Sequence, residues 1–163
     1  MKPWPLLALA ALYGCAATTA GAPQPTKSCV DFTTYVGGET VKGSIQYERF
    51  KVSRSRGLPI EIYDPASDLG LRGDVSVRIE NHLYVATTEP YSKFEISYIS
   101  KSQEPVRVET YDDSATVLQT QYLVAAPQGV VLTQEIDEPK TTKYVGLYDG
   151  GGEAALTKFC VIY

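Results

Sequence analysis

The sequence predicts an all-β protein, a single antiparallel β-sandwich of the jelly-roll or immunoglobulin-like type with about nine or ten strands. Three observations lead to this prediction. Apolar residues recur at every second position, and no window keeps the helical spacing. β-branched and aromatic residues dominate these alternating runs. Clusters of Gly, Pro, Asp and Ser separate the runs roughly every 10 to 15 residues, as turns between short strands do.

Four segments show the alternation most clearly. Successive side chains of a strand point to opposite faces, so each segment presents one apolar face to a core. In residues 143–149, Val145 and Leu147 share the inner face and leave Tyr144 and Tyr148 on the reverse face. The inner faces of the other three segments carry Val75, Val77 and Ile79; Phe94, Ile96 and Tyr98; and Val106 and Val108.

The segment "SIQYERFKV" breaks the alternation. Its apolar phase slips between Ile45 and Tyr47 on one side and Phe50 and Val52 on the other. An extra residue in one strand of a pair produces this pattern, so the slip predicts a β-bulge.

The first 22 residues are expected to form a signal peptide and tether, with the sandwich domain over residues 28–163. Lys2 precedes the apolar run "LLALAALYG", whose nine residues are too few for a bilayer-spanning helix of about 20. Two cellular destinations remain open. Cleavage after Ala17 or Ala20 gives a secreted protein, whereas "LYGC" as a lipobox makes Cys15 the lipidated first residue of an outer-envelope lipoprotein.

Cys15, Cys29 and Cys160 are the three cysteines of the chain. Cys15 belongs to the leader on either interpretation. Disulfides persist in exported proteins, so the remaining pair predicts one bridge, between Cys29 and Cys160. Such a bridge ties the first strand of the domain to the last.

Charge and the ionisable residues exclude some functions. The net charge is −4 and the leader contains one lysine and no acid, so a nucleic-acid partner is not expected. The single histidine, His82, is interpreted as a strand residue, because no nucleophile motif accompanies it. Acids such as Asp112 and Asp113 fall in turns, where turn chemistry, calcium binding and catalysis remain alternatives, the first favoured. The protein is therefore not expected to be an enzyme.

Tyrosine supplies the candidate ligand-binding residues. The chain has 12 tyrosines, and its single tryptophan, Trp4, lies in the leader. Tyrosine stacks on sugar rings and offers rigid contact area. Tyr91 and Tyr111 lie next to turns, and Asp112 and Asp113 follow Tyr111 directly. These four residues are predicted to bind ligand.

The order of motifs resembles exported bacterial jelly-roll domains of the carbohydrate-binding-module-like kind. The resemblance covers most of the chain after the leader and rests on "CVDF" at 29–32, "VRVETYDDSATVL" at 106–118 and "GGGEAALTKFC" at 150–160. It implies a structural calcium held by an acid on the first strand and an acid on the last. Asp31 matches the first position. Thr157 stands at the second, where Glu153 is the substitute ligand expected.

Together these features predict an exported, non-enzymatic cell-surface domain that binds a glycan or an envelope component. The alternative is a structural or interaction subunit of an envelope or adhesion assembly, with a surface protein as partner. No cofactor is expected apart from the calcium, and contact with a membrane is expected only through a lipid on Cys15.

Overall fold

The structure is a computed structural model. The predicted leader, Cys15 included, and Glu153 lie outside the residues that it describes. Within the described part of the chain, no helix has the length and hydropathy to cross a membrane. The described residues are 26–64, 76–79, 82–89, 91, 93–100, 105–127, 129–137, 142–149 and 154–163.

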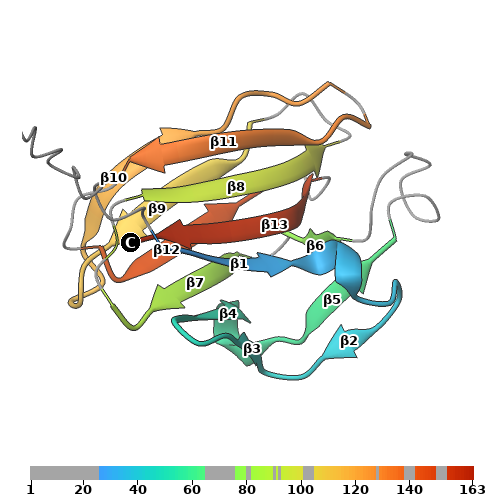
Figure 1. Cartoon of the computed structure of the whole chain (residues 1–163), viewed down its shortest axis with the longest axis horizontal. Helices are drawn as coiled ribbons and strands as arrows, with labels where there is room; N and C mark the ends of the chain where they lie inside the picture. Colours follow the sequence, from blue (N-terminus) through green and yellow to red (C-terminus); the bar gives the residue numbers. More distant parts are fainter. Residues whose placement is uncertain are drawn as a thin grey trace, which may run out of the picture.

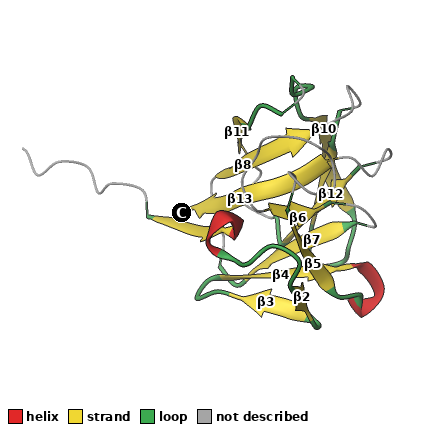
Figure 2. Ribbon diagram, turned by 90° about the vertical axis from the view of Figure 1, so that its right-hand side faces the viewer, coloured by secondary structure: helices red, strands yellow, loops and turns green. Residues whose placement is uncertain are grey.

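The described residues form thirteen strands and two single 3-10 turns, which confirms the all-β class (Figure 2). The strand number exceeds the nine or ten predicted, and two of the strands, β2 and β3, are only two and three residues long. The strands are β1 (Lys27–Asp31), β2 (Thr40–Val41), β3 (Ser44–Gln46), β4 (Phe50–Arg54), β5 (Ile60–Tyr63), β6 (Ser76–Arg78), β7 (Leu83–Thr87), β8 (Lys93–Ser100), β9 (Arg107–Tyr111), β10 (Val117–Tyr122), β11 (Leu132–Asp137), β12 (Tyr144–Tyr148) and β13 (Ala154–Ile162). The turns are η1 (Phe32–Thr34) and η2 (Ser55–Gly57).

The strands build two antiparallel sheets. The first sheet has the order β11-β8-β13-β6-β5-β2, with β1 also paired to β13, and the second has the order β10-β9-β12-β7-β4-β3. In Figure 1, β11, β8, β13 and β1 lie side by side in one layer. Neighbours in the sheets are mostly far apart in sequence, so the fold brings distant segments onto common faces.

The inner faces of the two sheets enclose one main core, as the alternation predicted. Phe94 of β8 and Phe159 of β13 stack with their ring centroids 5.5 Å apart, and Phe159 also meets Phe50 of β4 from the other sheet at 6.0 Å. Val145 and Leu147 of β12 are completely buried from the opposite side. Burial of this apolar surface is the main force that holds the two layers together.

The predicted β-bulge within "SIQYERFKV" is wrong. β3 and β4 form a hairpin in which Ile45 pairs with Val52, and the Tyr47 N–H donates to the carbonyl oxygen of Phe50 at 2.9 Å. The chain therefore reverses direction at the slip in phase, and both Ile45 and Val52 still face the core. A tight turn and a bulge give the same local pattern of apolar residues.

The predicted disulfide between Cys29 and Cys160 is confirmed. The two cysteines are direct partners in the β1–β13 register, with their Cα atoms 4.0 Å apart, and 131 positions separate them in sequence. The Tyr163 N–H donates to the carbonyl oxygen of Thr26 at 2.9 Å, so pairing continues to the last residue. The bridge and this ladder fix both ends of the domain.

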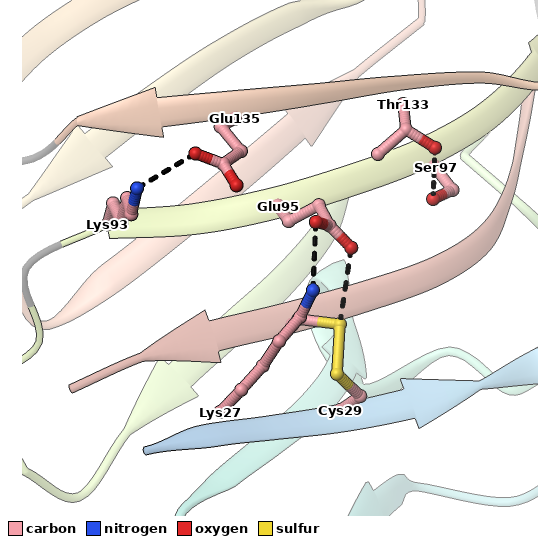
Figure 3. Close-up of polar contacts among 8 residues, drawn as sticks. Lys27, Cys29, Lys93, Glu95, Ser97, Thr133 and Glu135 are labelled. Atoms are coloured by element: carbon pink, nitrogen blue, oxygen red, sulfur yellow. Dashed lines mark hydrogen bonds and ion pairs between the residues drawn. A yellow bond between two sulfur atoms is a disulfide. The ribbon is translucent and has the colours of Figure 1, made fainter. Parts of the chain in front are cut away.

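Polar pairs surround the disulfide on the outer face of the first sheet (Figure 3). Lys27 of β1 reaches across β13 to Glu95 of β8 at 2.8 Å. Farther along the face, Lys93 bonds Glu135 of β11 at 2.8 Å, and the hydroxyls of Ser97 and Thr133 lie 2.9 Å apart. Cross-strand pairs of this kind help to fix the register of neighbouring strands.

We expect the double variant Cys29→Ser/Cys160→Ser to fold but to lose about 2–5 kcal/mol of unfolding free energy, since the bridge closes a very long loop. Urea denaturation followed by circular dichroism measures the loss. As a control, a reducing agent should lower the midpoint of the wild type toward that of the variant and leave the variant unchanged. Equal urea midpoints for the oxidised and reduced wild type would contradict the prediction.

Candidate functional site

Four tyrosines gather on the outer face of the second sheet. Tyr84 of β7, Tyr111 of β9, and Tyr144 and Tyr148 of β12 each alternate with residues buried in the core. The register places Tyr144 opposite Tyr111 on one side of β12 and Gly146 opposite Tyr84 on the other. Three neighbouring strands therefore present aromatic side chains to one patch, which we call the tyrosine patch.

Gly146 gives the tyrosine patch its shape. A Cβ atom built on Gly146 would lie 2.8 Å from both Cε2 and the hydroxyl oxygen of Tyr148. The Tyr148 ring therefore covers the strand where a side chain is missing, and only 9% of the residue is exposed although it belongs to the outer face. A side chain at position 146 would displace the ring.

The tyrosine hydroxyls form a connected network. The Tyr111 hydroxyl donates to the carboxylate of Glu109 and contacts the Tyr148 hydroxyl, which lies 3.5 Å from that of Tyr84. The Arg107 guanidinium stacks 4.6 Å from the centroid of the Tyr148 ring, and its Nε lies 3.4 Å from Glu109. These contacts fix the orientation of Tyr111 and Tyr148 before any ligand arrives.

Partial burial in this network changes the acidity of two tyrosines. Desolvation, together with the hydrogen bond to Glu109, raises the pKa of Tyr111 to about 12. Desolvation and the hydrogen bond with Tyr111 raise the pKa of Tyr148 strongly as well. Both hydroxyls therefore stay protonated well above physiological pH, and Tyr111 keeps the hydrogen that it donates to Glu109.

Two hollows flank Tyr84 on this face. The first has a volume of about 280 Å³ and is lined by Tyr84, Tyr111, Ala115 and Tyr144. The second has a volume of about 530 Å³ and is lined by Ser55, Arg56, Leu58, His82 and Tyr84. Tyr84 borders both hollows, and we call the two together the extended depression. The volume of the second hollow lies within the range of small-molecule sites, roughly 300–1,000 Å³.

The structure separates the predicted ligand-binding residues. Tyr111 lines the first hollow. Tyr91 is only 3% exposed and packs edge-on against Phe94 in the core, so it presents no surface to a ligand. The Asp112 carboxylate accepts from the N–H groups of Ser114 and Thr116 at 2.8 and 2.9 Å, which fixes the β9–β10 turn beside Ala115 of the hollow. Asp113 is exposed in the same turn.

Of the two predicted calcium ligands, Asp31 and Glu153, the structure describes Asp31. Asp31 accepts from the N–H and the hydroxyl of Thr33 at 3.0 and 2.6 Å, and so caps η1. Thr157 is buried, and its hydroxyl donates to the carbonyl oxygen of Ser97 at 3.0 Å where the β13–β8 register shifts. Glu153 lies outside the described residues. Within those residues, no group of three or more His, Cys, Asp or Glu could hold a metal, and the calcium stays a prediction.

Sequence reasoning missed Tyr84, Tyr144, Tyr148, Gly146 and the neighbourhood of His82. The alternation had placed Tyr144 and Tyr148 on the reverse face, and Tyr84 follows the same parity between Leu83 and Val85. A search for tyrosines out of phase with the core would have found them. His82 is not a strand residue. It precedes β7 with φ of 64° and sets its ring edge-on to Tyr148, with centroids 4.4 Å apart.

The fold and this outer face define an antiparallel β-sandwich with an aromatic depression. No family model matches the chain, and no curated protein matches it. Similar solved structures include a cleaved adhesin domain of Lys-gingipain, 13% identical, covering 83% of this chain and 99% of that chain with a TM-score of 0.47.

Carbohydrate-binding modules are among the similar structures as well. A family 29 module from Piromyces equi is 8% identical over 85% of this chain and 90% of its own, with a TM-score of 0.43. The C-terminal family 6 module of a laminarinase from Zobellia galactanivorans is 12% identical over 85% of this chain and 100% of its own, with a TM-score of 0.39.

We expect Gly146→Ala to destabilise the protein by about 1–3 kcal/mol, because the new methyl group meets the Tyr148 ring. In a Tyr148→Ala background the same change should be neutral or slightly stabilising, since an extended alanine loses less backbone freedom on folding than glycine. A double-mutant cycle of urea denaturation measures this coupling. Equal costs of Gly146→Ala in both backgrounds would show that the ring does not lie over Gly146.

We also expect a late phase in the spectrophotometric titration of tyrosine. Tyr111 keeps its proton up to about pH 12 in the folded protein and only to about pH 10 in the unfolded chain. The folded state therefore binds more protons between these values, and its stability must fall as pH rises through them. The pKa values of Tyr47 and Tyr148 are raised as well, so Tyr111→Phe should remove the component with its midpoint near pH 12 and lower the amplitude of the late phase by one tyrosine. A late phase of unchanged amplitude in that variant would refute the assignment.

Proposed function

We propose that this chain is an exported, non-enzymatic domain that binds a glycan through the tyrosine patch. The observation that carries the proposal is the convergence of Tyr84, Tyr111 and Tyr144 on one hollow of about 280 Å³. A tyrosine ring offers a flat apolar face to the C–H groups of a sugar ring and a hydroxyl for a hydrogen bond. Tyr144 is 38% exposed, which leaves its ring accessible for stacking.

The fixed hydroxyl network supports binding of a polar ligand. Tyr111 and Tyr148 are already oriented by Glu109, Arg107 and each other, so a ligand orders few side chains when it binds. Immobilising a flexible side chain costs about 0.5–1.5 kcal/mol on binding. A preorganised patch avoids much of this cost, which favours the weak, numerous contacts that a sugar offers.

The carboxylate chemistry of the patch supports a non-catalytic role. Glycoside hydrolysis commonly uses two carboxyl groups that flank the scissile bond. Glu109, the acid beside the tyrosines in the described chain, already accepts from the Tyr111 hydroxyl and faces Arg107. Its carboxylate serves to position Tyr111, and none of the described residues that line the first hollow is an acid.

The disulfide supports export. A bridge between Cys29 and Cys160 persists in oxidising compartments such as the periplasm or the cell exterior, and is rare in the cytosol of mesophiles. It agrees with the leader predicted over residues 1–22. We propose that the domain acts at the cell surface or in the surrounding medium.

We expect a glycan array with the wild-type protein to show binding, and Tyr144→Ala to weaken the affinity for the best ligand about tenfold or more. Tyr144→Phe should retain most of the affinity, because it keeps the stacking face. Calorimetry measures both changes. Tyr122→Ala is the matched control, since Tyr122 is 61% exposed on the same sheet and does not line the hollow. An equal loss in Tyr122→Ala, or no binding on the array, would contradict the proposal.

A second candidate function is protein interaction through the edge strand β10. Val117, Leu118, Tyr122 and Val124 are exposed along this edge, and no charged residue occurs from Ser114 to Gln134. Edge strands usually carry charges that discourage pairing with another chain. A stoichiometric protein partner that co-purifies without glycan would favour this role over the first.

A further inference from the structure

The second hollow differs chemically from the tyrosine patch beside it. Arg56 and His82 both line it, and both are exposed. Within the described chain, Arg56 has no hydrogen-bond or ion-pair partner, and the His82 ring meets the Tyr148 ring edge-on without a side-chain hydrogen bond. The described lining residues include no acid. An otherwise acidic protein therefore presents uncommitted N–H donors in one hollow.

The backbone at these two residues is held in an unusual conformation. Arg56 has φ of 56° and His82 has φ of 64°, both in the left-handed region that glycine prefers. The Ser55 N–H donates to the carbonyl oxygen of His82 at 3.0 Å, and the Leu58 N–H donates to that of Ser55 at 3.2 Å. These bonds tie η2 to the start of β7 and keep both side chains at the same hollow.

Such strain points to function. Residues in sparsely populated backbone regions are strained and cluster at ligand sites. The third non-glycine residue with positive φ in the described chain is Ala115, which lines the first hollow. All three therefore border the extended depression, although the described residues reach over both sheets.

The second hollow continues the first. Tyr84 lines both, and the His82 ring lies 4.4 Å from the Tyr148 ring of the tyrosine patch. A ligand that stacks on Tyr144 and extends past Tyr84 reaches Arg56 and His82. Charge-assisted hydrogen bonds from a guanidinium to a carboxylate or sulfate are shorter and stronger than neutral ones.

We propose that Arg56 and His82 bind an anionic substituent, a carboxylate or a sulfate, on the glycan held by the tyrosine patch, so that the domain selects acidic over neutral sugars. This inference rests on the proposed glycan-binding function and adds the class of glycan. Arg56 supplies the charge, and His82 supplies a further ring N–H donor. Tyr84 separates the site for the anion from the site for stacking.

Matched pairs of probes test the selectivity. The first pair is oligogalacturonate and its methyl ester, and the second is dextran sulfate and dextran oligosaccharides, with affinities measured by calorimetry at two salt concentrations. We expect the wild type to bind the acidic member of at least one pair about ten- to hundredfold more tightly, with a preference that falls as salt rises. The two pairs distinguish a carboxylate from a sulfate.

The variants at position 56 separate a binding role from a structural one. Arg56→Asn removes the charge but suits a left-handed backbone, so it should abolish the selectivity while thermal stability stays equal or rises. Arg56→Lys should retain part of the selectivity. The control Arg49→Asn changes an arginine that stacks on Tyr163 away from both hollows and should leave the selectivity intact. His82→Asn should weaken binding of the acidic probe alone.

The outcomes separate the two proposals. Equal binding of acidic and neutral members, lost in Tyr144→Ala, would overturn the anion site and leave glycan binding standing. Selectivity that survives Arg56→Asn would also overturn it. No binding of any probe, or of any glycan on the array, would overturn the glycan-binding function itself and this inference with it.

Discussion

On β12 alternate side chains go to opposite faces, and this two-residue period couples the core to the candidate site. Val145 and Leu147 are completely buried between the sheets, while Tyr144 and Tyr148 belong to the outer face. β12 lies between β9 and β7, so the same strand aligns Tyr111 on one side and Tyr84 on the other. A one-residue slip in its register would expose the core residues and bury the tyrosines. The force that packs the sandwich therefore also assembles the tyrosine patch.

The disulfide lies on the first sheet, where it prevents fraying of β1. β1 pairs only with the second half of β13, from Lys158 to Ile162, because β6 pairs with its first half. A five-residue strand at the start of a domain frays easily. The bridge between Cys29 and Cys160 and the bond from Tyr163 to Thr26 prevent this, and neither lies on the second sheet, which carries the tyrosine patch.

The fold class could be predicted from the sequence because it depends on a local pattern. The alternation in residues 94–98 and 143–149 survives in the structure. The bridge could be predicted because an exported chain whose Cys15 belongs to the leader leaves only Cys29 and Cys160 to pair. The slip in phase near Tyr47 was misread, since a bulge and a tight hairpin disturb the period alike. Tyr91 was misplaced for a related reason: proximity to a turn does not decide whether a ring points into the core.

The candidate site could be predicted only in part, because it depends on contacts between distant strands. Tyr111 was singled out, but its partners Tyr84 and Tyr148 lie 27 positions before it and 37 after it in sequence. Only the strand order β9-β12-β7 brings them together. The left-handed backbone at Arg56 and His82 could not be predicted from residue type, because glycine is the residue that usually adopts this conformation.

On this face, some side chains are held rigidly by their neighbours and others are exposed for contact with a ligand. Tyr148 is nearly buried and holds Tyr111 and Arg107 in place, while Tyr144 remains exposed and makes no hydrogen bond through its side chain in the described chain. A ligand on the patch would therefore order mainly Tyr144, with the remaining donors already oriented. The strained backbone at Arg56 and His82 also lowers the cost of binding, because the free energy of holding these residues in place is spent when the protein folds. Arg56→Asn relieves this strain, and Gly146→Ala pushes against the Tyr148 ring. Measuring both stability and ligand affinity for such variants distinguishes the residues that stabilise the sandwich from those that bind.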